Sequence, residues 1–280
     1  MFTHLDHLIV AVDDLEAAAK NYQTLFGMTP VWSGEHKELG TSNALFVFKN
    51  TYFELLSATG EGLGADLVNH YLNQSGEGLI GIVFATDDIK KAKSSLEEQG
   101  FNMPDISSGE GINSSDQQVR RWKNLFLPPE LSRGLFSFII EHTEGALPSP
   151  MSYEPSSPHS LDHVVINTND ADSFIDIYKD AFRIRLALDK TIEHWKKRML
   201  FFRLSKTTIE VIEEQNDQET ADTLWGLAWN VASIEETHKR LLGEGVDITP
   251  IKKGIKDKTL VATINSHTHN VPTLLIEHLD

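Results

Sequence analysis

Leu5-Asp6-His7-Leu8-Ile9-Val10 recurs later in the chain as Leu161-Asp162-His163-Val164-Val165-Ile166, with a spacing of 163 − 7 = 156 residues. A second stretch, Thr51-Tyr52-Phe53-Glu54-Leu55-Leu56, recurs as Thr207-Thr208-Ile209-Glu210-Val211-Ile212, and 210 − 54 gives the same spacing of 156. Two separate motifs in one gapless register indicate that the chain is built from two copies of one unit.

The later part of each copy repeats with a shorter spacing. Gly81-Ile82-Val83-Phe84 resembles Gly226-Leu227-Ala228-Trp229, and the pair Glu141 and Glu277 gives a spacing of 277 − 141 = 136 residues. The second copy has therefore lost loop residues. Four of the ten prolines lie in the stretch from Leu147 to Pro158, which predicts a linker because proline fixes φ and lacks a backbone donor. The predicted organisation is a first module over 1–146, a Pro/Ser-rich linker over 147–159 and a second module over 160–280.

Each copy reads as two halves with the order β-α-β-β-β. Leu5 to Val12 is apolar and rich in β-branched residues, which predicts a buried strand. Asp13-Asp14 then supplies a helix cap, and apolar residues follow at helical spacing until Gly27. Three further strands are predicted up to Ser57, and the order repeats from Leu79. The predicted fold class is α+β, with tandem paired βαβββ modules and two eight-stranded curved sheets.

Composition narrows the function classes. The chain has no cysteine, which excludes thiolate metal sites and cysteine nucleophiles. The net charge of −16 disfavours nucleic acid and anionic membranes, so we expect a small-molecule partner or a homodimer of this chain. Neither a secretory peptide nor a membrane-spanning run is visible, which predicts a cytoplasmic protein. Nucleophile-elbow, phosphate-loop and dinucleotide motifs are lacking too, so we expect no organic cofactor.

The paired halves resemble the vicinal oxygen chelate superfamily, which includes glyoxalases, bleomycin-resistance proteins and dioxygenases. The first copy is similar to its glyoxalase-like members in the runs 39–45 and 52–56, in Arg121-Trp122 and in Phe138-Ile139-Ile140-Glu141. Members of the superfamily catalyse isomerisation, ring cleavage or epoxide opening, or only bind drugs. The resemblance therefore implies a fold more strongly than an activity.

The resemblance also implies a divalent metal at the base of each curved sheet, held by residues of the first and last strands. The ligands it implies are His7, Glu54 and Glu141 in the first copy and, more weakly, His163, Glu210 and Glu277 in the second. Mn, Fe, Ni, Co or Zn would suit such a set, and Glu54 and Glu141 would be catalytic. The fourth position falls near Gly81 and Gly226, which have no donor. The alternative is that these side chains only line a polar pocket.

Other residues are candidates for binding substrate. His36 and Asn43 flank a loop before a strand, and Arg121 and Trp122 would pair with an anion and stack on it; turn chemistry and ordinary strand packing are the alternatives. We expect Trp225 and Trp229 in the core, and His142 and His278 on the outer surface or at an interface. The polar run 107–115 is a candidate lid, or an ordinary surface loop.

The leading hypothesis is a glyoxalase-like, metal-dependent lyase or isomerase that acts on a small oxygen-rich metabolite in the first copy. The second copy would be a degenerate or structural partner. One alternative is a metal-free protein that binds a small molecule, as bleomycin-resistance proteins do. Another is a structural dimerisation module whose curved sheets are filled by side chains.

Overall fold

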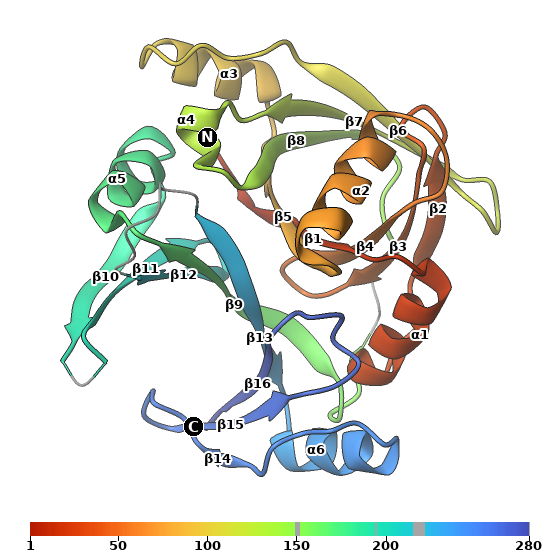
Figure 1. Ribbon diagram of the computed structural model, residues 1–280, viewed down its shortest axis with the longest axis vertical. Helices are drawn as coiled ribbons and strands as arrows, with labels where there is room; N and C mark the ends of the chain where they lie inside the picture. The colour runs from red at the N-terminus through yellow and green to blue at the C-terminus, as the bar shows by residue number, and fades with distance from the viewer. Residues whose placement is uncertain (149–151, 194, 215–221, 280) are drawn as a thin grey trace.

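The computed structural model describes residues 1–148, 152–193, 195–214 and 222–279. The first copy forms a closed barrel of eight strands in the order β1-β4-β3-β2-β6-β7-β8-β5 (Figure 1). Its elements, in chain order, are β1 (His4–Ala11), α1 (Leu15–Phe26), β2 (Trp32–His36), β3 (Thr41–Val47), β4 (Tyr52–Ala58), α2 (Leu63–Ser75), β5 (Gly78–Ala85), α3 (Ile89–Glu97), β6 (Ser107–Asn113), β7 (Val119–Phe126), α4 (Pro129–Ser132) and β8 (Phe136–Glu144).

The second copy forms an eight-stranded open sheet in the order β10-β11-β12-β9-β13-β16-β15-β14, which matches the first copy strand for strand. This arrangement confirms the predicted α+β fold with two eight-stranded curved sheets. The elements are β9 (Pro158–Thr168), α5 (Ala171–Ile175), the π-helix η1 (Asp176–Ala181), β10 (Arg185–Ile192), β11 (Lys197–Leu204), β12 (Thr207–Glu213), β13 (Thr223–Val231), α6 (Ile234–Gly243), β14 (Lys252–Lys253), β15 (Thr259–Ile264) and β16 (Thr273–His278).

Strand β6 closes the barrel of the first copy. It pairs with β7 on one side and with β2 on the other, where Gly34 faces Asn113 and Glu35 faces Ile112. The candidate lid over 107–115 is therefore wrong for its main part, because Ser107–Asn113 is a strand of the barrel wall. The corresponding strand of the second copy, β14, has only two residues and pairs with β15 alone. The second sheet stays open for this reason.

Helix α2 covers the interior of the barrel and is an element that the sequence analysis missed (Figure 1). Its side chains Val68, Tyr71 and Leu72 pack against a buried apolar cluster of the barrel interior that includes Ile9 and Phe138. Between β4 and β5 lie residues 59–77, whereas only 214–222 separate β12 from β13 in the second copy. Among the residues described, no helix combines the length and apolar character needed to cross a membrane.

The two copies share one hydrophobic core, because aromatic side chains of each copy pack on helices of the other. Trp229 of β13 contacts Phe26 of α1, with ring centroids 5.2 Å apart, and Phe84 of β5 contacts Phe182 just after η1, at 6.0 Å. Strands therefore pair within each copy, whereas aromatic side chains at the ends of α1 and η1 pack on a strand of the other copy. Trp229 is in the core as predicted, but the same prediction is wrong for Trp225, which is 51% exposed.

Candidate functional site

The site begins at a β-bulge in the first strand of each copy. The register of β1 against β5 shifts between Leu5 and His7, so that Asp6 is an extra residue. A bulge re-aims the side chains next to it, which explains how two neighbouring residues act together. Asp6 Oδ1 lies 2.6 Å from Nδ1 of His7 and fixes the orientation of its ring. His7 stacks on Tyr52, with ring centroids 4.4 Å apart.

Four polar side chains meet inside the barrel around Glu54 of β4. His7 Nε2 lies 3.3 Å from Glu54 Oε2, and the amide of Asn43 donates a hydrogen bond of 2.7 Å to Glu54 Oε1. Asn43 Nδ2 also lies 3.4 Å from Nε2 of His36, whose Nδ1 is 3.0 Å from the hydroxyl of Thr41. The structure thus brings together the predicted site residues His7, Glu54, Asn43 and His36, all of which are buried.

The charges of this cluster follow from burial and pairing. Burial is the largest influence on the pKa of His7 and lowers it, but Asp6 and Glu54 together outweigh burial, so the pKa is raised. Burial would raise the pKa of Glu54, but the hydrogen bond and charge of His7 reverse this and the pKa is lowered. Burial lowers the pKa of His36. The shifts of the pKa values therefore favour the charged forms of His7 and Glu54 and the neutral form of His36.

Glu141 does not join this cluster. Its Oε2 accepts a 2.8 Å hydrogen bond from the backbone of Ile89 at the start of α3, on the outer face of the barrel. Side chains alternate along a strand, so its neighbours Phe138 and Ile140 face inward instead. Near Gly81 an added Cβ would approach Ile9 to 3.0 Å, which leaves no room for a fourth ligand.

The donor set therefore does not fit the predicted metal centre. His7 and Glu54 converge, but Glu141, the third predicted ligand, points away from them and caps α3. Within the described part of the chain, no group of three or more His, Cys, Asp or Glu side chains is placed to hold a metal ion. The prediction that Glu141 completes a metal site with His7 and Glu54 is therefore wrong, because Glu141 lies on the outer face of the barrel.

The predicted pair Arg121 and Trp122 is also divided between two faces. Trp122 points into the barrel, where its ring lies 5.7 Å from that of His36. Arg121 points outward and pairs with Glu110 and Glu144. The inward arginine is its neighbour Arg120, which is buried and lies over the rings of Trp32 and Tyr52. Sequence reasoning missed Arg120, although counting two residues back from Trp122 along the strand identifies it.

The second copy repeats the polar cluster in a more open form. Asp162 lies at a bulge beside His163, whose Nε2 is 3.6 Å from Glu210 Oε2. The predicted third ligand Glu277 instead accepts a hydrogen bond of 2.7 Å from the backbone of Ile234 at the start of α6. His163 is 17% exposed at its side chain, against 3% for His7.

Two histidines placed on the outside by the sequence analysis contact these clusters. His142 Nε2 lies 3.1 Å from Asp6 Oδ2, and His278 Nε2 lies 2.7 Å from Asp162 Oδ2. Each aspartate therefore faces two histidines. The sequence analysis missed Asp6 and Asp162 because an aspartate before an inward histidine would point outward in a regular strand.

The rest of the lining differs between the copies. Strand pairing places Met199 where the first copy has Asn43, since Asn43 faces Leu56 and Met199 faces Ile212. By the same spacing of 156, His36 corresponds to Ile192 and Tyr52 to Thr208. Within the described ranges no amide side chain takes the place of Asn43 beside Glu210, and burial raises the pKa of Glu210, whereas the pKa of Glu54 is lowered.

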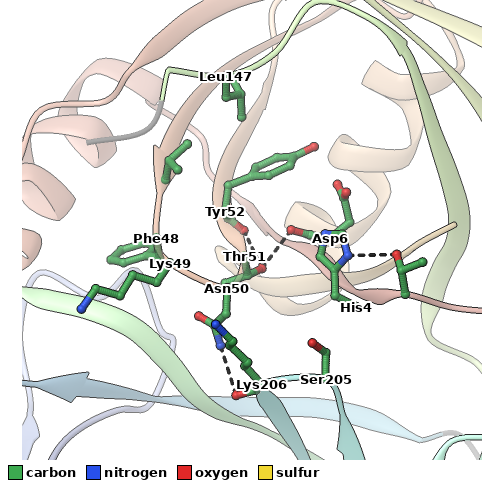
Figure 2. Close-up of a pocket in the computed structure, with 12 residues that line it drawn as sticks. His4, Asp6, Phe48, Lys49, Asn50, Thr51, Tyr52, Leu147, Ser205 and Lys206 are labelled. Atoms are coloured by element: carbon green, nitrogen blue, oxygen red, sulfur yellow. Dashed lines mark hydrogen bonds between the residues drawn. The ribbon is translucent and has the colours of Figure 1, made fainter. Parts of the chain in front are cut away.

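A cavity of about 360 Å³ lies at the end of the barrel that faces the second copy (Figure 2). Asp6 and Tyr52 line it from the barrel, and Ser205 and Lys206 line it from the turn between β11 and β12. Asn50 joins the two sides, because its Nδ2 donates to the carbonyl of Leu161 at 2.8 Å. Asp6 and Tyr52 therefore belong both to the cavity and to the immediate surroundings of His7.

Paired βαβββ halves that form eight-stranded curved sheets, with a polar cluster on neighbouring strands, are the architecture of the vicinal oxygen chelate class. The model of the family described as "Glyoxalase-like domain" matches residues 5–182, which is more than half of the chain. The chain therefore belongs to the glyoxalase-like domain family. The model of the Glyoxalase/Bleomycin resistance protein/Dioxygenase superfamily matches residues 160–263, in the second copy.

Individual relatives agree with this assignment. The chain is 30% identical over 110 residues to an ethylmalonyl-CoA/methylmalonyl-CoA epimerase of Cereibacter sphaeroides, across 39% of this chain and 79% of that protein. A solved mutant of 4-hydroxymandelate synthase from Streptomyces coelicolor has a TM-score of 0.68 and 14% identity, over 99% of this chain and 93% of the other. The Mn(II)-bound glyoxalase of Novosphingobium aromaticivorans has a TM-score of 0.64 and 16% identity, over 100% and 83%. At these identities the two structures show a shared fold.

Proposed function

We propose that the barrel of the first copy binds a small oxygen-rich metabolite and transfers a proton on it, as an isomerase or a lyase does. The observation that carries this proposal is the buried contact of 3.3 Å between His7 and Glu54, with Asp6 behind the histidine. A carboxylate and an imidazolium held side by side supply an acid and a base in one place. The epimerase in the same family supports a reaction of this kind.

The proposed chemistry needs only side chains of this chain. The carboxylate of Glu54 takes a proton from the carbon next to a carbonyl group, and the electron pair of the broken C–H bond moves to the carbonyl oxygen. The cationic ring of His7 donates a hydrogen bond to this oxygen, where the negative charge develops. Return of the proton to another face or atom gives the isomer. Asp6 keeps the ring of His7 in the required orientation.

Deuterium exchange tests this proposal directly. A panel of small 2-oxo and 2-hydroxy acids and their esters is incubated with the protein in D₂O, with EDTA in one set and MnCl₂ in another. Mass spectrometry then reports deuterium at the carbon next to the carbonyl group. We expect incorporation with the native protein in both sets and none with Glu54→Gln. Absence of exchange across the panel would contradict the proposal.

A metal-free binding protein is the second candidate, and the lining of the barrel favours it. Four aromatic rings line the interior, from Trp32, Tyr52, Trp122 and Phe138, whereas only one of the two predicted catalytic carboxylates faces inward. Calorimetric titration with the same panel separates the two candidates. Binding without deuterium exchange would support this candidate over the enzyme.

A further inference from the structure

Arg120 is a buried cation without a carboxylate partner. It is 6% exposed, and its Nε has no hydrogen-bond partner. Among the described residues, no Asp or Glu oxygen lies within ion-pair distance of its guanidinium group, although Arg121 beside it pairs with two glutamates on the outer face. Burying an unpaired charge is costly, so proteins keep such groups mainly where a ligand completes them.

Two aromatic rings fix the orientation of the guanidinium plane of Arg120. It lies 5.5 Å from the ring of Trp32 and 5.6 Å from the ring of Tyr52. Tyr52 is also a hydrogen-bond partner of the group. Stacking on the two rings fixes the plane of the group, and its unpartnered Nε lies on an edge that suits a planar, two-oxygen acceptor. Tyr52 also lines the cavity of about 360 Å³ at the barrel end, so one residue contacts both the cavity and Arg120.

A second polar atom of the same barrel lacks a partner. Asn43 donates through Nδ2 to Glu54, but its Oδ1 is buried without a hydrogen bond. Oδ1 is an acceptor, whereas the Nε–H of Arg120 is a donor. A ligand that satisfies both atoms must carry an acceptor for the arginine and a donor for the amide. A carboxylate and a hydroxyl group on one small molecule meet this requirement.

We propose that Arg120 binds the carboxylate of a small hydroxy acid, whose hydroxyl group donates to Asn43. This inference rests on the proposed use of the first barrel as the substrate site, and it names the chemical class of that substrate. Arg120 is then a specificity-determining residue, separate from the acid–base pair of His7 and Glu54. The exposed neighbour Arg121 has no part in it.

Calorimetric titration with matched anionic and neutral probes tests the inference. The probes are lactate and 2-hydroxybutyrate, each compared with its uncharged amide. We expect the native protein to bind each acid more tightly than its amide. Arg120→Gln should weaken binding of the acids by about 10- to 100-fold, since a hydrogen bond to a charged group is lost. Arg121→Gln, the matched control on the outer face, should change it by less than about twofold.

Arg120→Lys is a second variant in case Arg120→Gln does not fold. It keeps the positive charge but lacks the planar guanidinium group that binds a carboxylate through two hydrogen bonds. It should weaken acid binding by about 3- to 10-fold, with native circular dichroism. Equal affinity for acid and amide, an Arg120→Gln variant that binds acids like the native protein, or equal loss of acid and amide binding would overturn the inference. Titration needs no turnover, so failure of deuterium exchange alone removes the proposed reaction and leaves the carboxylate site.

Discussion

The two copies start from one strand order but end as different structures. The first is a closed barrel covered by α2, and the second is an open sheet. The difference comes from two segments, the longer connection that contains α2 and the seven-residue strand β6 in place of the two-residue β14. Both copies keep the Asp-His-Glu cluster, but only the closed copy surrounds it with His36, Asn43 and Arg120. The repeated motif therefore has different surroundings in the two copies, which lower the pKa of Glu54 and raise the pKa of Glu210.

The largest expected effect concerns the core that both copies share. Trp229→Ala should lower the free energy of unfolding by about 3–5 kcal/mol, because the ring is buried between β13 and the aromatic side chains of the first copy. Urea unfolding followed by circular dichroism measures the change. Trp225→Ala on the same strand is the control and should stay within about 0.5 kcal/mol. Similar losses in both variants would contradict the exchange of aromatic contacts across copies.

The second largest effect is a difference between Glu54 and Glu210 in the rate of deuterium exchange. Glu54→Gln should reduce the rate of deuterium exchange by about 100-fold or more, because it removes the proposed base. Glu210→Gln should leave the rate within about twofold, since the second copy lacks the polar lining. The measurement is the initial rate on whichever acid of the panel exchanges fastest. Equal losses would show that the open sheet of the second copy contributes to the reaction, which would contradict its assignment to the first copy alone.

A pH dependence of stability should be stronger in the closed copy. The folded pKa of His7 is raised above its ordinary value of 6.5, so its contribution is complete below that pH and is lost as pH rises through the folded pKa. The folded pKa values of Asp6 and Glu54 are lowered, so their contributions are present above about pH 4.5 and are lost as pH falls.

Stability from this cluster should therefore be greatest between about pH 4.5 and 6.5. Urea unfolding of the native protein should show a lower free energy of unfolding at pH 9 than at pH 6. His7→Gln should remove most of this loss, and His163→Gln should remove less of it because His163 is more exposed. A pH profile that is the same in all three proteins would speak against the assigned charges.

The smallest effect should be the same in both copies. Glu141→Ala and Glu277→Ala each remove an acceptor from the first turn of a helix, which should cost about 1 kcal/mol of unfolding free energy. Neither change should alter deuterium exchange, because both carboxylates lie on the outer face of their sheets. A large loss of exchange in Glu141→Ala would restore this residue to the site.

The sequence predicts the fold well because repeats and strand periodicity are local signals. His7 and Glu54 lie in motifs that recur at a spacing of 156, and the resemblance to the vicinal oxygen chelate superfamily implies their role in a site. Glu141 and Arg121 were predicted to face the barrel interior, but in each case the inward residue is the preceding one. Successive side chains of a strand point to opposite faces, so a shift of one residue moves the side chain from the interior to the outer face. The bulge at Asp6 is set by pairing with β5, so the strand's own sequence does not show it.

Two elements were missed for different reasons. Ala65, Val68 and Leu72 have the spacing of a helix, so α2 was detectable, although its place over the barrel depends on partners far away in the sequence. Strand β6 is polar and contains two glycines, and no local propensity predicts it. It becomes a strand because β2 and β7 both supply backbone partners.

The crossed packing of aromatic residues has a consequence for how such a chain can arise. Tyr22 and Phe26 of α1 correspond at the 156-residue spacing to Tyr178 and Phe182. Phe26 packs on Trp229 of the second copy, and Tyr178 and Phe182 pack on Phe84 of the first. A single-copy ancestor with this packing would have been an obligate two-fold symmetric pair of identical subunits. Within one polypeptide the two halves need not be identical, so that one half can enclose a chamber while the other keeps the shared interior in place.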